Sequence, residues 1–270
     1  MGLRVAPRRD GSTSPHDNQQ YGLENIGQMC ASKPVAEWSS LVTAHFNSML
    51  QSRADHETTA NLTWDELQPR LGIRLMEITD HSMFDWSLWR EDLPGIASMV
   101  FVDEPTAITN LKRDRVIELG VLTEHVFENA FDNLQSLAPV KRSAFPLEEG
   151  GEIVLLEGES PFAAAHALHL ERHVGVLGRH GAFISVPTRH TVLVLPFNDL
   201  YILRTLQHLL NIAAIMHRDG PGSISTNVYW IHNEDRIQLP YKVTERGAAI
   251  TPPDELTEFL NRLAEAEEGA

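Results

Sequence analysis

The 270-residue chain contains one cysteine, Cys30. A single cysteine excludes an intrachain disulfide, so stability does not depend on an oxidising compartment. It also excludes the PCxxC half of a zinc deaminase signature, although His169-Leu170-Glu171 matches the first half. The hydrophobic share of 42% is sufficient for one large core or two modest cores without a disulfide or a structural metal.

Long apolar runs are also missing. No stretch approaches the ~20 consecutive apolar residues that a membrane span requires. The longest apolar segment, about Leu203 to Met216, is interrupted by polar side chains. The basic start of the sequence has no apolar run behind it, unlike a secretory signal. We therefore expect a cytoplasmic protein with no membrane partner.

Basic residues are few. The chain has 22 Lys and Arg against 37 Asp and Glu, a formal net charge of −15. The average field of such a protein repels nucleic acid, and no Lys/Arg run with interleaved aromatic residues offsets it. We expect no nucleic-acid partner.

The strongest catalytic signatures are absent from the sequence. It has no GxxxxGK[ST] phosphate loop, no GxGxxG fingerprint, no HExxH and no GxSxG elbow. The glycine-rich run from Gly175 to Gly181 lacks the lysine and follows a helix instead of a strand. Whether the protein is an enzyme therefore stays open.

The hydrophobic pattern alternates between helices and strands. Paired strands separated by short polar turns indicate antiparallel pairing. We predict an α+β fold with a mixed or mainly antiparallel sheet and helices packed against it, possibly in two lobes. Strands are expected at 73–78, 98–102, 152–157, 182–186, 191–195, 227–232 and 236–241. Helices are expected at 35–51, 111–119, from 123, at 161–174, from about 199 to Gly220, and from 251.

Three parts of the chain differ in composition. Residues 1–20 contain almost no apolar side chains and are predicted to be a disordered tail. Residues 21–140 form a predicted helix-rich N-terminal lobe, and residues 151–266 a C-terminal α+β lobe. A loop with Pro139, Pro146 and two glycines is expected between them. One continuous domain is the alternative.

The first predicted helix carries a regular apolar pattern. Its apolar residues and His45 recur at the i, i+3, i+4, i+7 spacing of one buried helix face. The residues on this face are Trp38, Leu41, Val42, His45, Phe46 and Met49. The polar residues 52–63 that follow are predicted to be a loop.

Four segments of the sequence form a distinctive set: MVFVDEPTAI at 99–108, TEHVFENAFDNL at 123–134, SPFAAAHAL at 160–168 and GAFISVPTRHTVLVLP at 181–196. Together they resemble the YtpQ-like family of uncharacterised bacterial proteins. The family shows a similar "VPxRD" turn before an apolar strand, and here His190 stands where it usually has aspartate. The resemblance covers roughly 95–240. It implies a bacterial protein of similar fold and brings no activity and no catalytic residues.

Three histidines form the one candidate for metal chemistry. On an α-helix, His166, His169 and His173 would fall within an arc of about 60°. Imidazoles so placed suit zinc or another transition metal, which would support a metal-dependent hydrolase. The alternatives are a polar stripe beside a buried alanine-rich face and a pH-responsive surface. No other cofactor is expected.

Two further groups are candidate binding residues. Arg189 and His190 lie in a predicted turn, and Asp103 and Glu104 end a predicted strand, so neighbouring strands would join the four into a polar patch. A solvent-exposed turn is the plainer interpretation. Trp86 and Trp89 lie in an aromatic segment that either fills the core or contacts a partner.

Together these observations favour a non-catalytic binding protein with a protein partner. The motivation is the missing enzyme signatures, the acidic charge and the tryptophan-rich segment. The metal-dependent hydrolase is the alternative, and a small-molecule binding domain is a third possibility.

Overall fold

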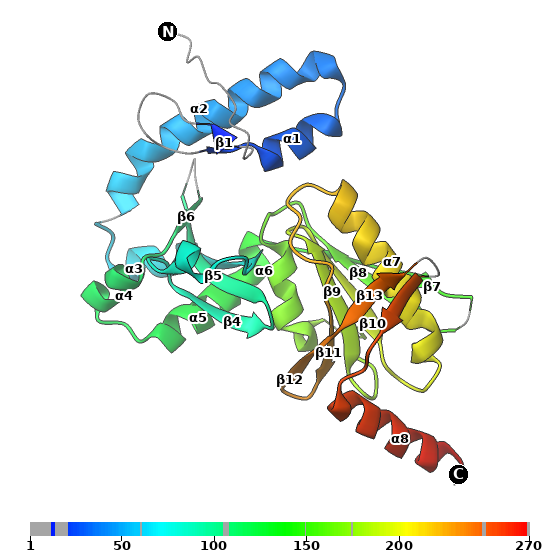
Figure 1. The fold of residues 1–270 in the computed structure, drawn as a ribbon. Helices are drawn as coiled ribbons and strands as arrows, with labels where there is room; N and C mark the ends of the chain where they lie inside the picture. The colour runs from blue at the N-terminus through cyan, green and yellow to red at the C-terminus, as the bar shows by residue number, and fades with distance from the viewer. Residues whose placement is uncertain are drawn as a thin grey trace.

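The computed structural model describes residues 12–13, 21–59, 61–104, 108–148, 150–173, 175–244 and 247–268. Helices and antiparallel sheets pack together in it, which confirms the α+β prediction (Figure 1). Every strand pair in this part of the chain is antiparallel. The expectation of a mainly antiparallel sheet is therefore correct.

The smaller main sheet is built around a buried central strand. Its strands are β3 (Leu71–Glu77), β4 (Trp89–Leu93), β5 (Ile96–Asp103) and β6 (Ile108–Asn110). β3 pairs with one edge of β5, while β4 and then β6 pair with its other edge. All residues of β5 except Asp103 are buried, which explains its continuous apolar sequence.

The larger sheet has six strands in the order β12-β11-β9-β10-β8-β7. The strands are β7 (Lys141–Pro146), β8 (Glu152–Glu157), β9 (Ala182–Thr188), β10 (Thr191–Pro196), β11 (Val228–His232) and β12 (Asp235–Leu239). Strands β8 to β11 are largely buried, since the sheet is covered on both faces.

The two faces of this sheet belong to different hydrophobic clusters. On one face, α7 (Ile202–Asp219) and α8 (Asp254–Glu268) pack against inward residues such as Phe183 and Trp230. On the other, residues such as Ile184 and Val192 join side chains of the smaller sheet and of α5 (Thr123–Asp132). Figure 1 shows α7, in yellow, on the side of the six-stranded sheet away from β5. One core thus connects both sheets.

The remaining elements are short or peripheral. The helices are α1 (Glu24–Ala31), α2 (Val35–Thr59), α3 (Trp64–Leu67), η1 (Gln68–Arg70), η2 (His81–Phe84), α4 (Arg113–Leu119) and α6 (Leu134–Leu137). Two small hairpins pair β1 (Ser12–Thr13) with β2 (Tyr21–Gly22) and β13 (Tyr241–Thr244) with β14 (Gly247–Ile250).

The predicted α-helix at 161–174 is wrong. The chain forms two 3₁₀ helices there, η3 (Ala163–Leu168) and η4 (Leu170–Arg172). All six residues of η3 are buried, so this segment has no solvent-facing side. The amide of Ala164 donates to the carbonyl of Arg189, 3.1 Å away in the β9–β10 turn, instead of to a helical partner. Tertiary contacts have replaced the regular helical bonds.

The N-terminal helix also differs from its prediction. α2 continues to Thr59, through most of the predicted polar loop at 52–63. Its apolar face is not part of the core, because Trp38 and Val42 are exposed and His45 is half-buried. The helical period was read correctly, and α2 packs mainly on α1 instead of on a sheet.

The expected loop between the two predicted lobes is in fact a β-hairpin. β7 pairs with β8 along its whole length, from Lys141↔Glu157 to Pro146↔Glu152. β7 is an edge strand, where proline is tolerated because its missing N–H faces outward. Of the predicted disordered tail, residues 1–11 and 14–20 lie outside the described residues. In the part of the chain described, no helix has the length and apolar character needed to cross a membrane.

Candidate functional site

The three histidines of the predicted metal site are separated by the 3₁₀ geometry. His166 and His173 meet, with 2.9 Å between His166 Nδ1 and His173 Nε2. His169 instead pairs with Glu171 at 2.8 Å and lies edge-on against Phe131. Within the described residues, no three His, Cys, Asp or Glu side chains are grouped to hold a metal. Among the described residues the three rings therefore do not converge, and only His166 and His173 are in contact.

The buried member of this group has a structural role. His166 is 1% exposed, and its Nε2 lies 2.7 Å from the carbonyl oxygen of Ala138. Because a carbonyl only accepts, Nε2 carries the proton, and Nδ1 accepts the hydrogen bond from His173. Burial lowers the pKa of His166 to about 4, so the ring is neutral at neutral pH. The hydrogen bond from His166 to Ala138 thus joins η3 to the end of α6.

The two strand ends of the expected polar patch belong to different sheets. Asp103 and Glu104 end β5 of the smaller sheet, whereas Arg189 and His190 lie between β9 and β10 of the larger one. Asp103 is exposed, although partial burial raises the pKa of its carboxyl. Glu104 is buried, and one of its oxygens accepts from the Thr109 hydroxyl at 3.0 Å. None of the described ion pairs joins the two groups.

The tryptophan segment divides between core and surface. Trp89 packs against Phe84 beside a small buried cluster on β5. Trp86 is 52% exposed. Trp89 thus fits the core interpretation, whereas for the exposed Trp86 contact with a partner stays a prediction.

Trp86 lies at the wall of a hollow of about 690 Å³, here called the arginine pocket. Its lining residues come from β3, β6, the turn before β4 and the start of α4, and they are Arg74, Trp86, Ile108, Thr109, Asn110, Lys112 and Asp114. Small-molecule sites typically have volumes of roughly 300–1,000 Å³. The size and the mixture of aromatic, amide and cationic side chains suit a small ligand.

Arg74 is the deepest charged group of the pocket. It lies on β3 opposite Met99 and is half-buried, with its Nε shielded from solvent and without a hydrogen-bond partner. Burial lowers the pKa of Arg74, and the positive charge of Arg189 lowers it further. A guanidinium nevertheless stays protonated at neutral pH. Arg74 is thus a half-buried positive charge on which the charge of Arg189 acts.

Arg189 is held from three directions. Its amide donates to the Gly222 carbonyl at 2.9 Å, and its Nε donates to His190 Nε2 at 3.1 Å. Its side chain lies directly on Gly222, where an added Cβ would come within 2.5 Å of Arg189 Cδ. Gly222 also has a φ of +69°, which favours glycine. The terminal nitrogens of Arg189 have no acceptor among the described residues.

His190 orients this arginine. Its Nδ1 lies 3.2 Å from the carbonyl oxygen of Gly158, so the proton is on Nδ1 and Nε2 is free to accept from Arg189. Burial and the charge of Arg189 lower the pKa of His190, which keeps the ring neutral. Both ring nitrogens are engaged. His190 is therefore a positioning residue.

The N-terminal helices reach the same turn. Gln28 of α1 accepts from the Gly222 amide at 2.9 Å and donates to the Ser223 hydroxyl at 3.1 Å. On α2, burial lowers the pKa of His45, with a further decrease from the charge of Arg189. Arg189 therefore contacts the loop at Gly222, and its charge acts on His45 of α2.

The arginines lack the partners that arginines usually have. Among the described residues no carboxylate forms an ion pair with Arg74, Arg189 or Lys112, whereas Arg142, Arg172 and Arg218 each have one. This occurs in a chain with 37 acidic residues. A half-buried positive charge is costly unless it is paired. An external anion would supply the missing negative charge.

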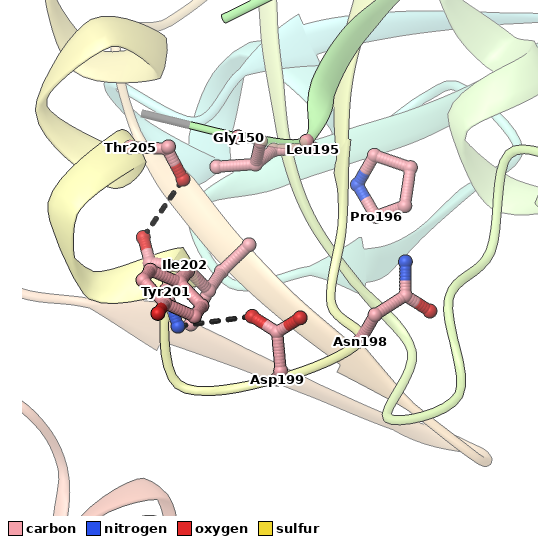
Figure 2. Close-up of a pocket in the computed structure, with 9 residues that line it drawn as sticks. Gly150, Leu195, Pro196, Asn198, Asp199, Tyr201, Ile202 and Thr205 are labelled. Carbon is pink, nitrogen blue, oxygen red and sulfur yellow. Dashed lines mark hydrogen bonds between the residues drawn. The ribbon is translucent and has the colours of Figure 1, made fainter. Parts of the chain in front are cut away.

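A second hollow, of about 200 Å³, lies at the start of α7 (Figure 2). Two of its polar side chains already have partners inside the protein. Asp199 accepts from the Tyr201 amide at 3.0 Å, and the Thr205 hydroxyl donates to the Ile202 carbonyl at 3.0 Å. Both bonds are dashed in Figure 2 and lie at the start of α7. We assign no function to this hollow.

Sequence reasoning found one residue of the arginine pocket, because it selected Trp86 as a contact residue. It also selected Arg189 and His190 as a turn with functional potential, and these two residues do not line the pocket. It missed Arg74, which lies between Ile73 and Leu75 in an alternating strand and therefore resembles an ordinary solvent-facing residue. Its proximity to Arg189 depends on how the two sheets pack, and no sequence pattern carries that information.

Comparisons with known proteins add no assignment. No protein-family model matches the chain. No curated protein and no solved structure matches it either. The resemblance to the YtpQ-like family stays an expectation from the sequence.

Proposed function

We propose that the chain is a non-catalytic binding protein whose arginine pocket holds an anionic ligand. The supporting observation is Arg74, a half-buried guanidinium that lines the pocket and has no carboxylate partner among the described residues. The charge of Arg189 lowers the pKa of Arg74 further, so a second positive charge acts on the same site. Guanidinium groups bind phosphate and carboxylate oxygens through parallel N–H donors. A bound anion would neutralise the repulsion between the two cations.

A binding role also agrees with the chemistry around the pair. The nearest histidine, His190, has both ring nitrogens engaged, so it supports Arg189 instead of offering a proton acceptor. The cytoplasmic location and bacterial origin expected from the sequence are kept as part of this proposal.

The predicted protein partner is the second candidate. Trp86 and Ile108 are exposed at the pocket, and exposed aromatic side chains often anchor protein interfaces. On this alternative, an acidic side chain of the partner would enter the pocket and reach Arg74.

Thermal unfolding in the presence of anions tests the proposal. Inorganic phosphate and sulfate should raise the Tm above that in chloride at equal ionic strength, because a ligand that binds only the folded state stabilises it. Arg74→Gln and Arg189→Gln should abolish the increase. Arg179→Gln is the matched control, since Arg179 is exposed and does not line the pocket. Equal increases in all four proteins would contradict the proposal.

A further inference from the structure

The arginine pocket contains more than positive charge. Its wall includes the indole of Trp86, the carboxamide of Asn110, the hydroxyl of Thr109 and the carboxylate of Asp114. A simple inorganic anion would make no favourable contact with an aromatic face or with a nearby carboxylate. The composition indicates a ligand with an anionic end and a polar, ring-bearing remainder.

Trp86 supplies a surface suited to a flat group. Its side chain is 52% exposed although the backbone beside it is fixed, with the Trp86 carbonyl accepting from the Arg113 amide at 3.3 Å. Exposure of a large aromatic ring costs free energy in the absence of a ligand. Planar heterocycles stack on indole rings regardless of their identity. An exposed indole on a fixed turn therefore fits a stacking platform.

The position of the charges limits what the anionic end can be. Arg74 is half-buried within the pocket, so the anionic group must project to reach it. A single phosphate ester carries about two negative charges at one end of a molecule. A segment with many carboxylates would place some of them near Asp114 and in the field of a protein with net charge −15. One concentrated charge is favoured over several dispersed ones.

Asn110 and Asp114 fit the remainder of such a ligand. A carboxamide both donates and accepts, and an ionised carboxylate accepts from hydroxyl or amino groups. The backbone of Asn110 is fixed in β6 opposite Phe101, so its position relative to the Arg74 strand is defined by the sheet. These groups suit the sugar hydroxyls or ring substituents of a phosphorylated heterocycle.

From this arrangement we infer that the ligand is a phosphate ester carried by a planar ring, with the phosphate at Arg74 and the ring on Trp86. This inference rests on the proposed anion-binding function and adds the requirement that the ligand carry a planar ring. Nucleoside monophosphates have this chemistry and serve as the probe.

Calorimetric titration with four ligands tests the inference: adenosine monophosphate, ribose 5-phosphate, inorganic phosphate and adenosine. Adenosine monophosphate should bind roughly tenfold or more tightly than ribose 5-phosphate, because only the former can stack. Trp86→Ala should remove this preference and leave the affinity for ribose 5-phosphate unchanged. Arg74→Gln should weaken both phosphate esters. Trp38→Ala, which changes another exposed tryptophan outside the pocket, is the control.

The outcomes separate the two proposals. Equal affinities for both phosphate esters, unchanged by Trp86→Ala, would overturn the ring inference and leave the anion site intact. If no phosphate-containing ligand binds and a poly-glutamate peptide does, the inference is wrong and the protein-partner alternative replaces it. Absence of binding by every anion would overturn both proposals.

Discussion

Arg74 and Arg189 illustrate how a single residue can be poorly placed for stability and well placed for binding. Their positive charges repel each other in the ligand-free protein, and no carboxylate among the described residues compensates. Residues of binding sites often reduce stability in this way. The feature is visible only when both side chains and their surroundings are known.

Replacing either arginine should therefore stabilise the ligand-free protein. We expect Arg74→Gln and Arg189→Gln each to raise the free energy of unfolding by about 0.5 kcal/mol, because repulsion between partly solvated charges is small. Urea denaturation in chloride buffer measures the change. Arg74→Lys keeps the charge and should not show the gain. A loss of stability in both glutamine variants would indicate that the arginines serve packing.

His166 should make stability depend on pH. Burial lowers its pKa from 6.5 to about 4, so between these values the unfolded chain binds a proton that the folded state does not. The free energy of unfolding should fall as the pH decreases from 6.5 to 4, by at most about 1.4 kcal/mol per pH unit from this residue. Above pH 6.5 it contributes no slope.

Denaturation at several pH values measures this slope. His166→Gln should flatten it, because glutamine can still donate to the Ala138 carbonyl and does not titrate. The lowered pKa values of His45, His173 and His190 act in the same direction and keep part of the slope. His125→Gln, an exposed position on α5, is the control. Equal slopes for wild type and His166→Gln would contradict the prediction.

At the scale of elements, the turn between β9 and β10 depends on the loop that follows α7. Gly222 supplies a carbonyl to Arg189, an amide to Gln28 and an open space for the Arg189 side chain. A distant glycine thereby fixes a residue of the proposed site.

Gly222→Ala should consequently impair binding as well as stability. The methyl group would displace Arg189 and strain a φ of +69°, so we expect a loss of about 1–2 kcal/mol and loss of the phosphate-induced Tm increase. Gly120→Ala is a matched control, with φ of +65° and no atom within 4 Å of its added Cβ. It should lose stability and keep binding. Preserved anion binding in Gly222→Ala would show that the loop does not position Arg189.

Elements with strong local patterns were predictable from sequence. β8 was predicted at its observed bounds, and α5 begins at Thr123 as expected, with Val126, Phe127, Ala130 and Phe131 buried. The helix expected at 111–119 is α4, which ends before Gly120 in the left-handed conformation. Local signals suffice where the hydrophobic period and the terminating residue agree.

Elements whose conformation depends on tertiary contacts were not predictable from sequence. The alanine-rich segment at 163–168 has good helix formers, but its enclosure between two sheets imposes 3₁₀ turns. β7 contains Pro146 and mostly exposed side chains, so only its pairing with β8 makes it a strand. The same limit applies to the arginine pocket, because its lining residues come from separate elements that only tertiary packing brings together.

At the scale of the whole molecule, one hydrophobic cluster includes residues from Leu67 to Tyr229. Tyr229 connects the sheets further, since its hydroxyl donates to the Pro94 carbonyl at 2.9 Å in the turn between β4 and β5. Burial raises the pKa of Tyr229 to about 12, so the hydroxyl keeps its proton.

This shared core should make the protein unfold in one transition. Far-UV circular dichroism and tryptophan fluorescence should give coincident urea curves, although the two lobes predicted from sequence would allow separate ones. Tyr229→Phe should lower the free energy of unfolding by about 1 kcal/mol, which moves the midpoint to a lower urea concentration, and should keep the curves coincident. Two resolved transitions would instead support independent lobes.

The burial of Cys30 has a practical consequence. Its thiol is the only one in the chain, is 7% exposed, and lies two residues from Gln28, the side chain that attaches α1 to the 222–223 loop. Alkylation of this sulfur therefore requires α1 to detach at least briefly. The rate at which Cys30 is alkylated, followed by mass spectrometry, should therefore report how often α1 opens, without any engineered label.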